Sequence, residues 1–297
     1  MGRGLFAKLR LTLEMIKFEH SVFALPFALT GALLAIREDA FATPRLAARL
    51  LWIVLAMVAA RSAAMTFNRI LDAEIDARNP RTRARHLPAG LLSKGFAWGF
   101  LAVSTAVFLL AARALNPLCF LLAPLALAVV FFYSYTKRFT SLSHLVLGFA
   151  LGIAPAAAWI AVRGSLDARI LLLTAAVTFW TAGFDIIYAC QDYEFDAREG
   201  LWSIPRRFGI SGALYIARAL HGAMVGCLAA LVAAFDLGPL SLAGIAVVAV
   251  LLAYEHSLVK PSDLSRVNAA FFTVNGYIGV LFFFFWTADI LILGPGA

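Results

Sequence analysis

Long apolar runs alternate with short polar segments along the whole chain of 297 residues. A run of about 20 apolar residues lets a helix cross the ~30 Å hydrocarbon core of a bilayer, with its backbone hydrogen bonds satisfied inside the helix. Such runs have their cores at residues 21–36, 50–68, 96–115, 117–134, 144–163, 169–189, 210–233, 238–256 and 270–292. The pattern predicts an all-α polytopic membrane protein with nine transmembrane helices, folded as a single domain over residues 1–297.

The composition agrees with this prediction. Hydrophobic residues make up 62% of the chain, charged residues 14%, and the mean hydropathy is +0.87, which is far outside the range of soluble globular domains. The three cysteines, Cys119, Cys190 and Cys227, lie far apart inside apolar runs, as is typical of small core residues and not of disulfides or metal ligands. Basic residues precede the first run as in a signal peptide, but no small-residue cleavage site follows, so we expect a retained helix.

Basic residues are unevenly distributed among the predicted loops. If the N-terminus is cytoplasmic, 17 of the 25 lysines and arginines fall on the inner side and six on the outer side. Because cytoplasmic loops are enriched in Lys and Arg, we expect the N-terminus inside and the C-terminus outside a cell's inner (cytoplasmic) membrane. Positive loops beside anionic lipid also account for most of the net charge of +8, so no nucleic-acid partner is needed.

Two of the inner loops combine acids with arginines. They read NRILDAEIDARNPRTRARHLPAG (68–90) and DIIYACQDYEFDAREGLWSIPRRFG (185–209). Either loop alone could be a solvated helix end whose acids pair with nearby arginines. Two such loops on the same side of the membrane indicate a binding site.

The polar residues of the first loop are spaced to share a helix face. Asn68, Asp72 and Asp76 are four residues apart, so a continuing helix stacks them with a rise of about 6 Å per step, whereas Glu74 points elsewhere. The spacing predicts a column of polar side chains at the cytoplasmic end of the helix.

The second loop repeats this arrangement. One helical stripe is predicted for Asp185, Tyr188, Asp192 and Asp196. Glu194 and Glu199 fall off that stripe. Sparse carboxylate oxygens suit Mg²⁺, which keeps several waters and is usually shared with substrate phosphates. Arginine and lysine beside them suit a diphosphate, because a guanidinium group binds phosphate oxygens bidentately.

Three motifs carry a family resemblance. NRILDAEID (68–76) resembles the N-x-x-x-D-x-x-x-D motif of the UbiA superfamily of intramembrane aromatic prenyltransferases, and DIIYACQDYEFD (185–196) resembles its D-x-x-Y-x-x-x-D-x-x-x-D motif. YSYTK (133–137) is similar to the family's Y-x-x-x-K motif. The three occur in order over essentially the full chain, and the resemblance implies a nine-helix bundle with a central cavity capped by cytoplasmic loops.

The resemblance also implies a reaction in quinone biosynthesis. A polyprenyl diphosphate ionises with the help of Mg²⁺, and an aromatic ring captures the allylic cation. The metal ligands implied by the motifs are Asn68, Asp72, Asp76, Asp192 and Asp196.

Further roles follow from the same resemblance. Lys137 would contact diphosphate oxygens, while Tyr133 and Tyr188 would line the site near the cation. Asp185 would orient Tyr188 or Lys137, or hold the acceptor. The loop arginines that we expect to bind the diphosphate are Arg81 and Arg85, for which the alternative is a lipid headgroup.

The position of Arg61 gives information about the chemical class of the acceptor. It lies two turns before Asn68 inside an apolar run, where a charge costs at least ~2.5 kcal/mol on insertion scales. The resemblance implies that it receives the carboxylate of an aromatic acid such as 4-hydroxybenzoate, and a naphthoate precursor of menaquinone fits as well. A structural salt bridge to Asp185 is the alternative.

Other signals are weaker. The opening KFEHSVFALPFALTGALLA (17–35) departs from the commonest family pattern at Lys17, Glu19 and His20. The sequence therefore does not identify the aromatic ring of the acceptor. His144, His221 and His256 are too scattered for a metal set. A haem farnesyltransferase or an enzyme prenylating a lipid glycerol remains an alternative within the family. The rival from another class is a cation-coupled transporter, although the acids gather at one membrane face and not at paired breaks near the midplane.

Overall fold

Helices make up the fold of the computed structural model, which describes residues 5–16 and 24–292. In these residues the only strand-like pairing is an isolated bridge between Lys260 and Asp263. The α-helices are α1 (Leu5–Met15), α2 (Leu25–Glu38), α3 (Leu46–Arg78), α4 (Lys94–Leu115), α5 (Pro117–Thr136), α6 (Ser143–Arg163), α7 (Leu171–Ala189), α8 (Tyr193–Glu199), α9 (Ile204–Ala234), α10 (Pro239–Ser257) and α11 (Asn275–Ile292). Two 3₁₀ turns, η2 (Ala168–Ile170) and η3 (Cys190–Asp192), flank α7, and a π-helix, η4 (Ala269–Val274), precedes α11. The predicted all-α class is confirmed.

Eight helical stretches of the described residues are long and apolar enough to cross a membrane. They are α3, α4, α5, α6, Ala168–Glu199, α9, α10 and Ala269–Ile292, and they coincide with the eight predicted runs after the first. The first predicted run, 21–36, corresponds to α2, whose 14 residues are fewer than the about 20 that a span needs. Residues 21–23 of that run lie outside the described residues, as do Lys17, Glu19 and His20. The chain is a multi-pass membrane protein with eight described spans where the pattern predicts nine.

The chain divides into two compact units. Unit 1 comprises Met1–Ser21 and Leu51–Ser134, and unit 2 comprises Val22–Leu50 and Tyr135–Ala297. The first loop therefore belongs to unit 1 and the second loop to unit 2. That residues 1–297 form a single domain stays a prediction.

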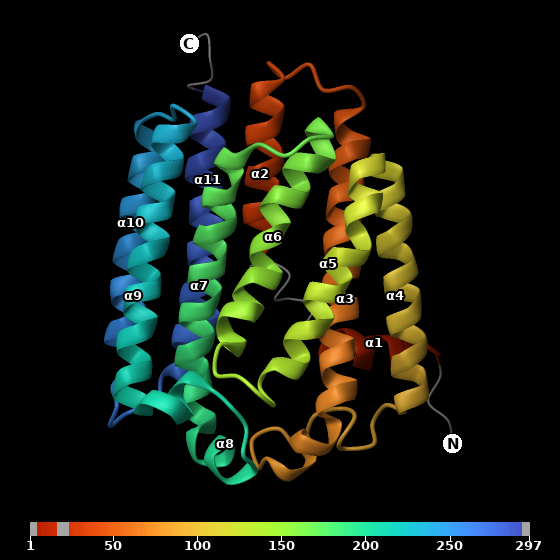
Figure 1. The fold of residues 1–297 in the computed structure, drawn as a ribbon, viewed down its shortest axis with the longest axis vertical. Helices are drawn as coiled ribbons and strands as arrows, with labels where there is room; N and C mark the ends of the chain where they lie inside the picture. Colours follow the sequence, from red (N-terminus) through yellow and green to blue (C-terminus); the bar gives the residue numbers. More distant parts are fainter. Residues whose placement is uncertain (1–4, 17–23, 293–297) are drawn as a thin grey trace. The chain divides into compact units, whose positions relative to one another are not determined.

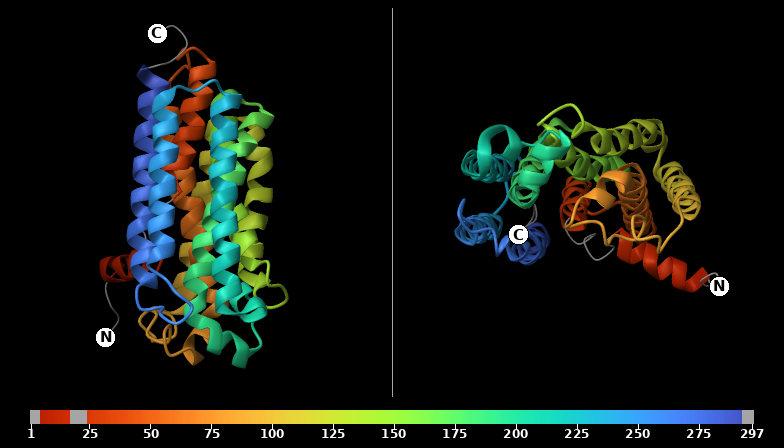
Figure 2. Two further views of the ribbon diagram at one scale, coloured as in Figure 1. Left: turned by 90° about the vertical axis from the view of Figure 1, so that its left-hand side faces the viewer. Right: turned by 90° about the horizontal axis from the view of Figure 1, so that it is seen from below.

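Unit 1 is built on the long helix α3. Figure 1 and Figure 2 show α1 lying across the direction of α3 and α4. One end of α1, with Met15 and Ile16, packs into a buried cluster with Ala73 of α3, Leu87 and Leu92 of the following loop, and Ala97 of α4. This cluster holds the loop that follows α3 against the helix from which it departs.

Unit 2 is arranged around α7, which packs against α6 on one side and α9 on the other, while α10 and α11 pack together (Figure 1). Helices α6 and α7 approach closely because Gly148 and Gly152 face Thr178, and a Cβ atom at either glycine would overlap it. Small residues of this kind allow close helix contacts inside membranes. The close packing fixes α7, which carries the first residues of the second motif.

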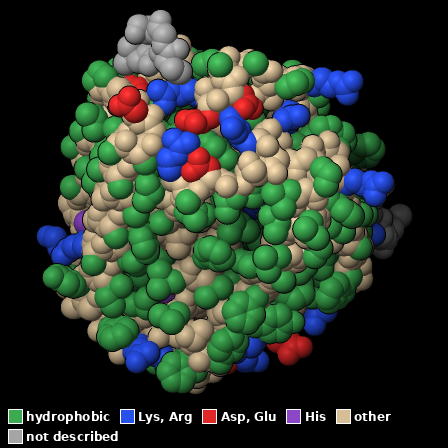
Figure 3. Space-filling model, turned by 45° about the horizontal axis from the view of Figure 1, so that its top comes forward, with side chains coloured by type: hydrophobic (Ala, Val, Ile, Leu, Met, Phe, Trp, Pro, Cys, Tyr) green, Lys and Arg blue, Asp and Glu red, His purple; other side chains and the backbone are tan. Residues whose placement is uncertain are grey.

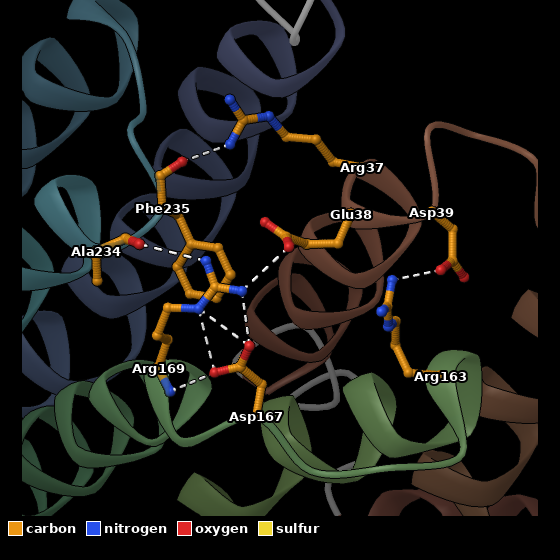
Figure 4. A network of polar contacts seen from close by, with 8 residues as sticks. All are labelled: Arg37, Glu38, Asp39, Arg163, Asp167, Arg169, Ala234 and Phe235. Carbon is orange, nitrogen blue, oxygen red and sulfur yellow. Dashed lines mark hydrogen bonds and ion pairs between the residues drawn. The ribbon is translucent and has the colours of Figure 1, made fainter.

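An ion-pair network lies where α7 begins, and Figure 4 shows it from close by. Arg169 donates from Nη2 to Asp167 Oδ2 at 2.7 Å and to Glu38 Oε2 at 3.1 Å. Its Nη1 donates to the carbonyl oxygen of Ala234 at 3.4 Å, and its guanidinium group lies 4.5 Å from the centroid of the Phe235 ring. One arginine thus joins the ends of α2 and α9 to the start of α7.

Three other arginines extend this network. Arg163 pairs with Asp39, and Arg37 donates to the carbonyl oxygen of Phe235 at 2.6 Å (Figure 4). Arg49 donates to the carbonyl oxygen of Val162 at 2.5 Å. In Figure 3 acidic and basic side chains gather near the top of the view, while hydrophobic side chains cover much of the surface below them, as a lipid-facing surface requires.

Candidate active site

The first motif occupies one unbroken helix. Asn68, Asp72 and Asp76 all lie in α3, which continues to Arg78, so the spacing places them on one face as predicted. Asn68 Nδ2 donates to Asp72 Oδ2 at 3.1 Å and approaches Ser134 Oγ at 3.5 Å. Glu74 is exposed, in agreement with its predicted position off this face.

The two aspartates of this motif are buried, so the alternative of a solvated helix end does not hold for the first loop. Asp72 is 2% exposed and Asp76 is 5% exposed. The reason is the loop after α3, which folds back over the helix and places Thr82 Oγ1 3.1 Å from the carbonyl oxygen of Asp76. Burial raises the cost of a lone carboxylate, so compensating charge is required.

Two arginines supply that charge. Arg85 Nη1 lies 2.7 Å from Asp76 Oδ1 and 2.8 Å from Asp76 Oδ2. Arg69, which is half-buried, lies close enough to Asp76 and Asp72 to interact with their charges, and Tyr133 is another neighbour. The sequence predicts Arg85 as a diphosphate ligand and indicates no role for Arg69. The only available signal for Arg69 was its place directly after Asn68.

Three other predicted site residues, Arg81, Arg61 and Tyr133, also belong to unit 1. Arg81 has an exposed side chain, and its backbone N–H donates to Asn79 Oδ1 at 2.9 Å. Arg61 is half-buried in α3, and its Nη1 donates to the carbonyl oxygen of Ile16 at 3.1 Å. Tyr133, also half-buried, belongs to the group around Arg69.

The second motif does not form one continuous helix, which corrects the predicted stripe. Helix α7 ends at Ala189, the 3₁₀ turn η3 follows, and α8 begins at Tyr193. A 3₁₀ turn has 3.0 residues per turn, so a four-residue spacing across it no longer keeps side chains in line. The difference in burial is nevertheless as expected: the half-buried residues are Asp185, Tyr188, Asp192 and Asp196, and the exposed ones are Glu194 and Glu199.

His144 holds Asp185 in place. Its Nδ1 lies 2.7 Å from Asp185 Oδ2, and its Nε2 accepts a hydrogen bond from the backbone N–H of Ile204 at 3.3 Å. Because Nε2 is an acceptor, Nδ1 carries the proton and donates to the carboxylate. This buried histidine links α6, α7 and the start of α9. Sequence reasoning set it aside as one of several scattered histidines.

Asp196 is held by the loop after α8. The Ser203 hydroxyl hydrogen-bonds to it, Lys137 attracts it and Asp192 repels it. The carbonyl oxygen of Lys137 accepts a hydrogen bond from the backbone N–H of Trp202 at 2.7 Å. Unit 2 therefore brings together three predicted site residues, Lys137, Asp192 and Asp196.

Tyr188 lies in an aromatic cluster. Its ring centroid is 4.3 Å from that of Phe271 and 5.9 Å from that of Phe272. Phe271 also packs edge-on against Phe184 at 5.1 Å. Both phenylalanines belong to the π-helix η4, a segment that the apolar pattern did not distinguish from the last span.

In neither unit do three histidine, cysteine, aspartate or glutamate side chains of the described residues form a group that could hold a metal ion by themselves. Hard cations such as Mg²⁺ commonly take only one or two carboxylates from the protein and complete their shell with water and substrate phosphates. The carboxylate and amide oxygens of the first motif, and the carboxylate oxygens of the second, are suitable partial ligand sets for such an ion.

The fold and these residues define a class: a helical multi-pass membrane protein that carries two aspartate-bearing helix ends, each accompanied by cationic side chains. A family model described as the UbiA prenyltransferase family matches residues 24–292. The chain belongs to the UbiA prenyltransferase family. The predicted family and the predicted polyprenyltransferase class are confirmed.

Individual proteins resemble the chain over most of its length. The 4-hydroxybenzoate octaprenyltransferase of Vibrio atlanticus is 31% identical over 238 residues, covering 78% of this chain and 83% of that protein. The apo structure of a UbiA homologue from Aeropyrum pernix is 35% identical with a TM-score of 0.81, covering 93% of this chain and 98% of the other. A UbiA homologue from Archaeoglobus fulgidus bound to GPP and Mg²⁺ is 21% identical with a TM-score of 0.73, covering 95% and 99%, and at this identity it shows the fold alone.

Proposed function

We propose that this protein transfers a polyprenyl group from a polyprenyl diphosphate to 4-hydroxybenzoate in quinone biosynthesis. The observation that carries the proposal is the first motif, where Asn68 is bonded to Asp72 and Asp76 is bonded to Arg85 on one face of α3. The name of the Vibrio relative supports the choice of acceptor and of a long prenyl chain.

Both motifs fit a hard divalent cation, and we propose Mg²⁺. The residues that would hold such an ion are Asn68, Asp72 and Asp76 in unit 1, and Asp192 and Asp196 in unit 2. Their donors are carboxylate and amide oxygens, which Mg²⁺ prefers. When bound, Mg²⁺ would neutralise charge on the diphosphate leaving group.

The cationic side chains would take the remaining charge of the diphosphate. As the allylic carbon–oxygen bond breaks, its electron pair leaves with the diphosphate, so donors aimed at those oxygens stabilise the transition state. Arg85 is suited to this because its guanidinium group already binds a two-oxygen anion, the Asp76 carboxylate. Lys137 would act from beside Asp196, and the exposed side chain of Arg81 could reach the diphosphate head group of the substrate.

The acceptor would be recognised by its carboxylate. Arg61 supports this role because it presents a guanidinium group within an apolar span, and a guanidinium group binds a carboxylate bidentately. Tyr133 and Tyr188 would line the site near the allylic cation. Asp185, oriented by His144, would be placed to hold the acceptor or to take up its proton.

We further propose that the protein lies in the cytoplasmic membrane with both motifs facing the cytoplasm. The support is the excess of lysine and arginine in the loops on that side.

The test incubates membranes containing the full chain with Mg²⁺, a labelled polyprenyl diphosphate and a panel of aromatic acids, and identifies products by mass. Prenylated 4-hydroxybenzoate is the expected product. A prenylated naphthoate would show that the acceptor is a naphthoate and would leave the proposed reaction unchanged. Prenyl transfer to none of the aromatic acids would overturn the proposed acceptor class.

A matched variant tests acceptor recognition. Arg61→Ala should raise the KM for the aromatic acid by about 100-fold, because a buried charge-assisted pair is lost, while slow hydrolysis of the diphosphate to prenyl alcohol persists. Arg61→Lys should restore only part of the affinity for the aromatic acid, because an ammonium group lacks the planar pair of N–H donors of a guanidinium group. Parallel loss of acceptor use and of hydrolysis would show that Arg61 does not serve the acceptor.

A further inference from the structure

A buried chain of polar contacts runs through unit 2 beside the second motif. Asn275, the first residue of α11, accepts a hydrogen bond from Trp180 Nε1 at 2.6 Å, and its Nδ2 donates to Glu255 Oε1 at 3.0 Å. All three side chains are 0% exposed. The contacts join α7, α10 and α11, and none of the three residues belongs to the three sequence motifs.

The same asparagine holds the π-helix. Its Nδ2 also lies 3.1 Å from the carbonyl oxygen of Ala270 and 3.2 Å from that of Phe271, both in η4. Because the amide nitrogen has two N–H groups and one is directed at Glu255, these two carbonyl oxygens share the other. π-Helical turns are rare, because their i→i+5 pattern distorts the backbone, and they occur frequently at functional sites. The amide of Asn275 thus satisfies backbone groups in the turn that sets the position of Phe271.

Phe271 in turn contacts the second motif. Its ring lies 4.3 Å from the ring of Tyr188 and 5.1 Å from that of Phe184, in tilted and edge-on arrangements that aromatic pairs favour. A continuous path of contacts therefore runs from Glu255 through Asn275 and the π-helix to Tyr188.

Glu255, at the far end of this path, carries a free-energy cost of burial. Glu255 is a fully buried carboxyl group inside a span, and among the described residues its Oε2 has no hydrogen-bond partner. A buried polar group without a partner costs free energy, and here a neutral amide could make the contact to Asn275 equally well.

We propose that Glu255 and Asn275 are positioning residues that hold the π-helix Ala269–Val274 so that Phe271 fixes the ring of Tyr188 in the second motif. This role rests on the proposed prenyl transfer, in which Tyr188 lies near the allylic cation. It predicts that the two residues affect the rate of reaction through Phe271 and not through general stability.

The test is a double-mutant cycle on the detergent-solubilised full chain, with kcat and KM measured for prenyl transfer. Asn275→Ala should lower kcat about tenfold, because small displacements of a reacting site are costly, and should leave the KM for the polyprenyl diphosphate within about threefold. In the Phe271→Leu background, where the stacking on Tyr188 is already lost, the same change should lower kcat less than about twofold. Ser241→Ala removes a buried hydroxyl from the same helix as Glu255 and should leave kcat unchanged.

A second pair of variants covers the case in which Asn275→Ala does not fold. Glu255→Gln retains an acceptor for Asn275 and should retain kcat, whereas Glu255→Ala should lower it as Asn275→Ala does. Equal losses of kcat for Asn275→Ala in both backgrounds, or equal effects of Glu255→Gln and Glu255→Ala, would overturn the positioning role alone. A wild-type protein that prenylates no acceptor would overturn the proposed function, and the positioning role with it.

Discussion

The two ends of α7 both gather acidic side chains, but they give these acids different partners. Where α7 begins, Glu38 and Asp167 are bonded to Arg169, and Asp39 is paired with Arg163. Where α7 ends, Asp185 is bonded to a neutral histidine and Asp196 to a serine hydroxyl. The carboxylates at the start of α7 are thus bonded directly to arginine, whereas those at its end are bonded to histidine and serine, with Lys137 attracting Asp196.

The difference teaches how to separate structural from functional charge. A carboxylate bonded to arginine has its charge and its lone pairs engaged, so it joins helix ends. A carboxylate oriented by neutral donors keeps its charge available to a cation from outside the protein, and a Mg²⁺–diphosphate substrate is such a partner. Clustered acids at a helix end thus do not by themselves indicate a substrate site. The type of hydrogen-bond donor that contacts them separates structural carboxylates from substrate-binding ones.

The largest expected effect comes from removing an acid at each end. Asp192→Ala should lower prenyl transfer at least about 10³-fold, because charge on the departing diphosphate is no longer stabilised, and should leave the unfolding temperature close to wild type. Asp167→Ala, the matched control, should lower the unfolding temperature and leave kcat unchanged. Excess EDTA should reproduce the Asp192→Ala loss in the wild-type protein. Wild-type turnover in Asp192→Ala, or full activity in EDTA, would abolish the distinction between the two ends.

Unit 1 contains an apparent exception, since Asp76 belongs to the first motif and yet is bonded to Arg85. If Arg85 exchanges this carboxylate for a diphosphate, Arg85→Ala should raise the KM for the polyprenyl diphosphate about 100-fold, with Arg85→Lys intermediate. A structural pair would instead resemble the network where α7 begins. An Arg85→Ala protein with a lowered unfolding temperature and an unchanged KM would show that the pair of Asp76 and Arg85 is structural.

Much of the fold was predictable from the sequence because membrane spans are set by length and apolarity. Eight of the nine predicted runs coincide with described helical stretches long enough to span a membrane, and the four-residue spacing of Asn68, Asp72 and Asp76 is kept because α3 continues without a break. The stripe of the second motif was wrong in detail because η3 changes the helical period between Ala189 and Tyr193. Nothing in the apolar pattern marks a 3₁₀ turn inside a long helical stretch.

The partners of the site residues were not predictable in the same way. His144 and Asp185 are 41 positions apart, and Trp180 and Asn275 are 95 apart, so their contacts depend on how α6, α7 and α11 pack. A single histidine or asparagine in an apolar helix has the same sequence appearance whether it orients a site residue or merely fills the core. Residues of this kind, which position a site residue without contacting the substrate, can be identified only once the packing of the helices is known.

A smaller effect on activity is expected from His144, which tests whether neutral donors matter at the end of α7. His144→Ala should lower kcat about tenfold, because Asp185 loses the donor that orients it. His144→Asn should recover much of the rate, since the amide N–H₂ can replace the Nδ1–H. The measurement is steady-state prenyl transfer with the unfolding temperature recorded alongside. Equal kcat for His144→Ala and wild type would show that Asp185 needs no orientation.

The smallest expected effect is a pH dependence of stability at the end where α7 begins. Hydrogen bonds from Arg169 hold the pKa of the Asp167 carboxyl below its usual value, which is about 3.9 in an unfolded chain. Because the folded pKa is the lower one, the contribution of Asp167 to stability is fully present above the unfolded pKa and is lost as the pH falls through the folded pKa. The unfolding temperature of the wild type should therefore exceed that of Asp167→Asn by a constant amount from about pH 7 to pH 5, and the difference should shrink below about pH 4. Taking the difference between the two proteins cancels the other carboxylates, and a difference that grows on acidification would mean that Asp167 is not stabilised by Arg169 in its charged form.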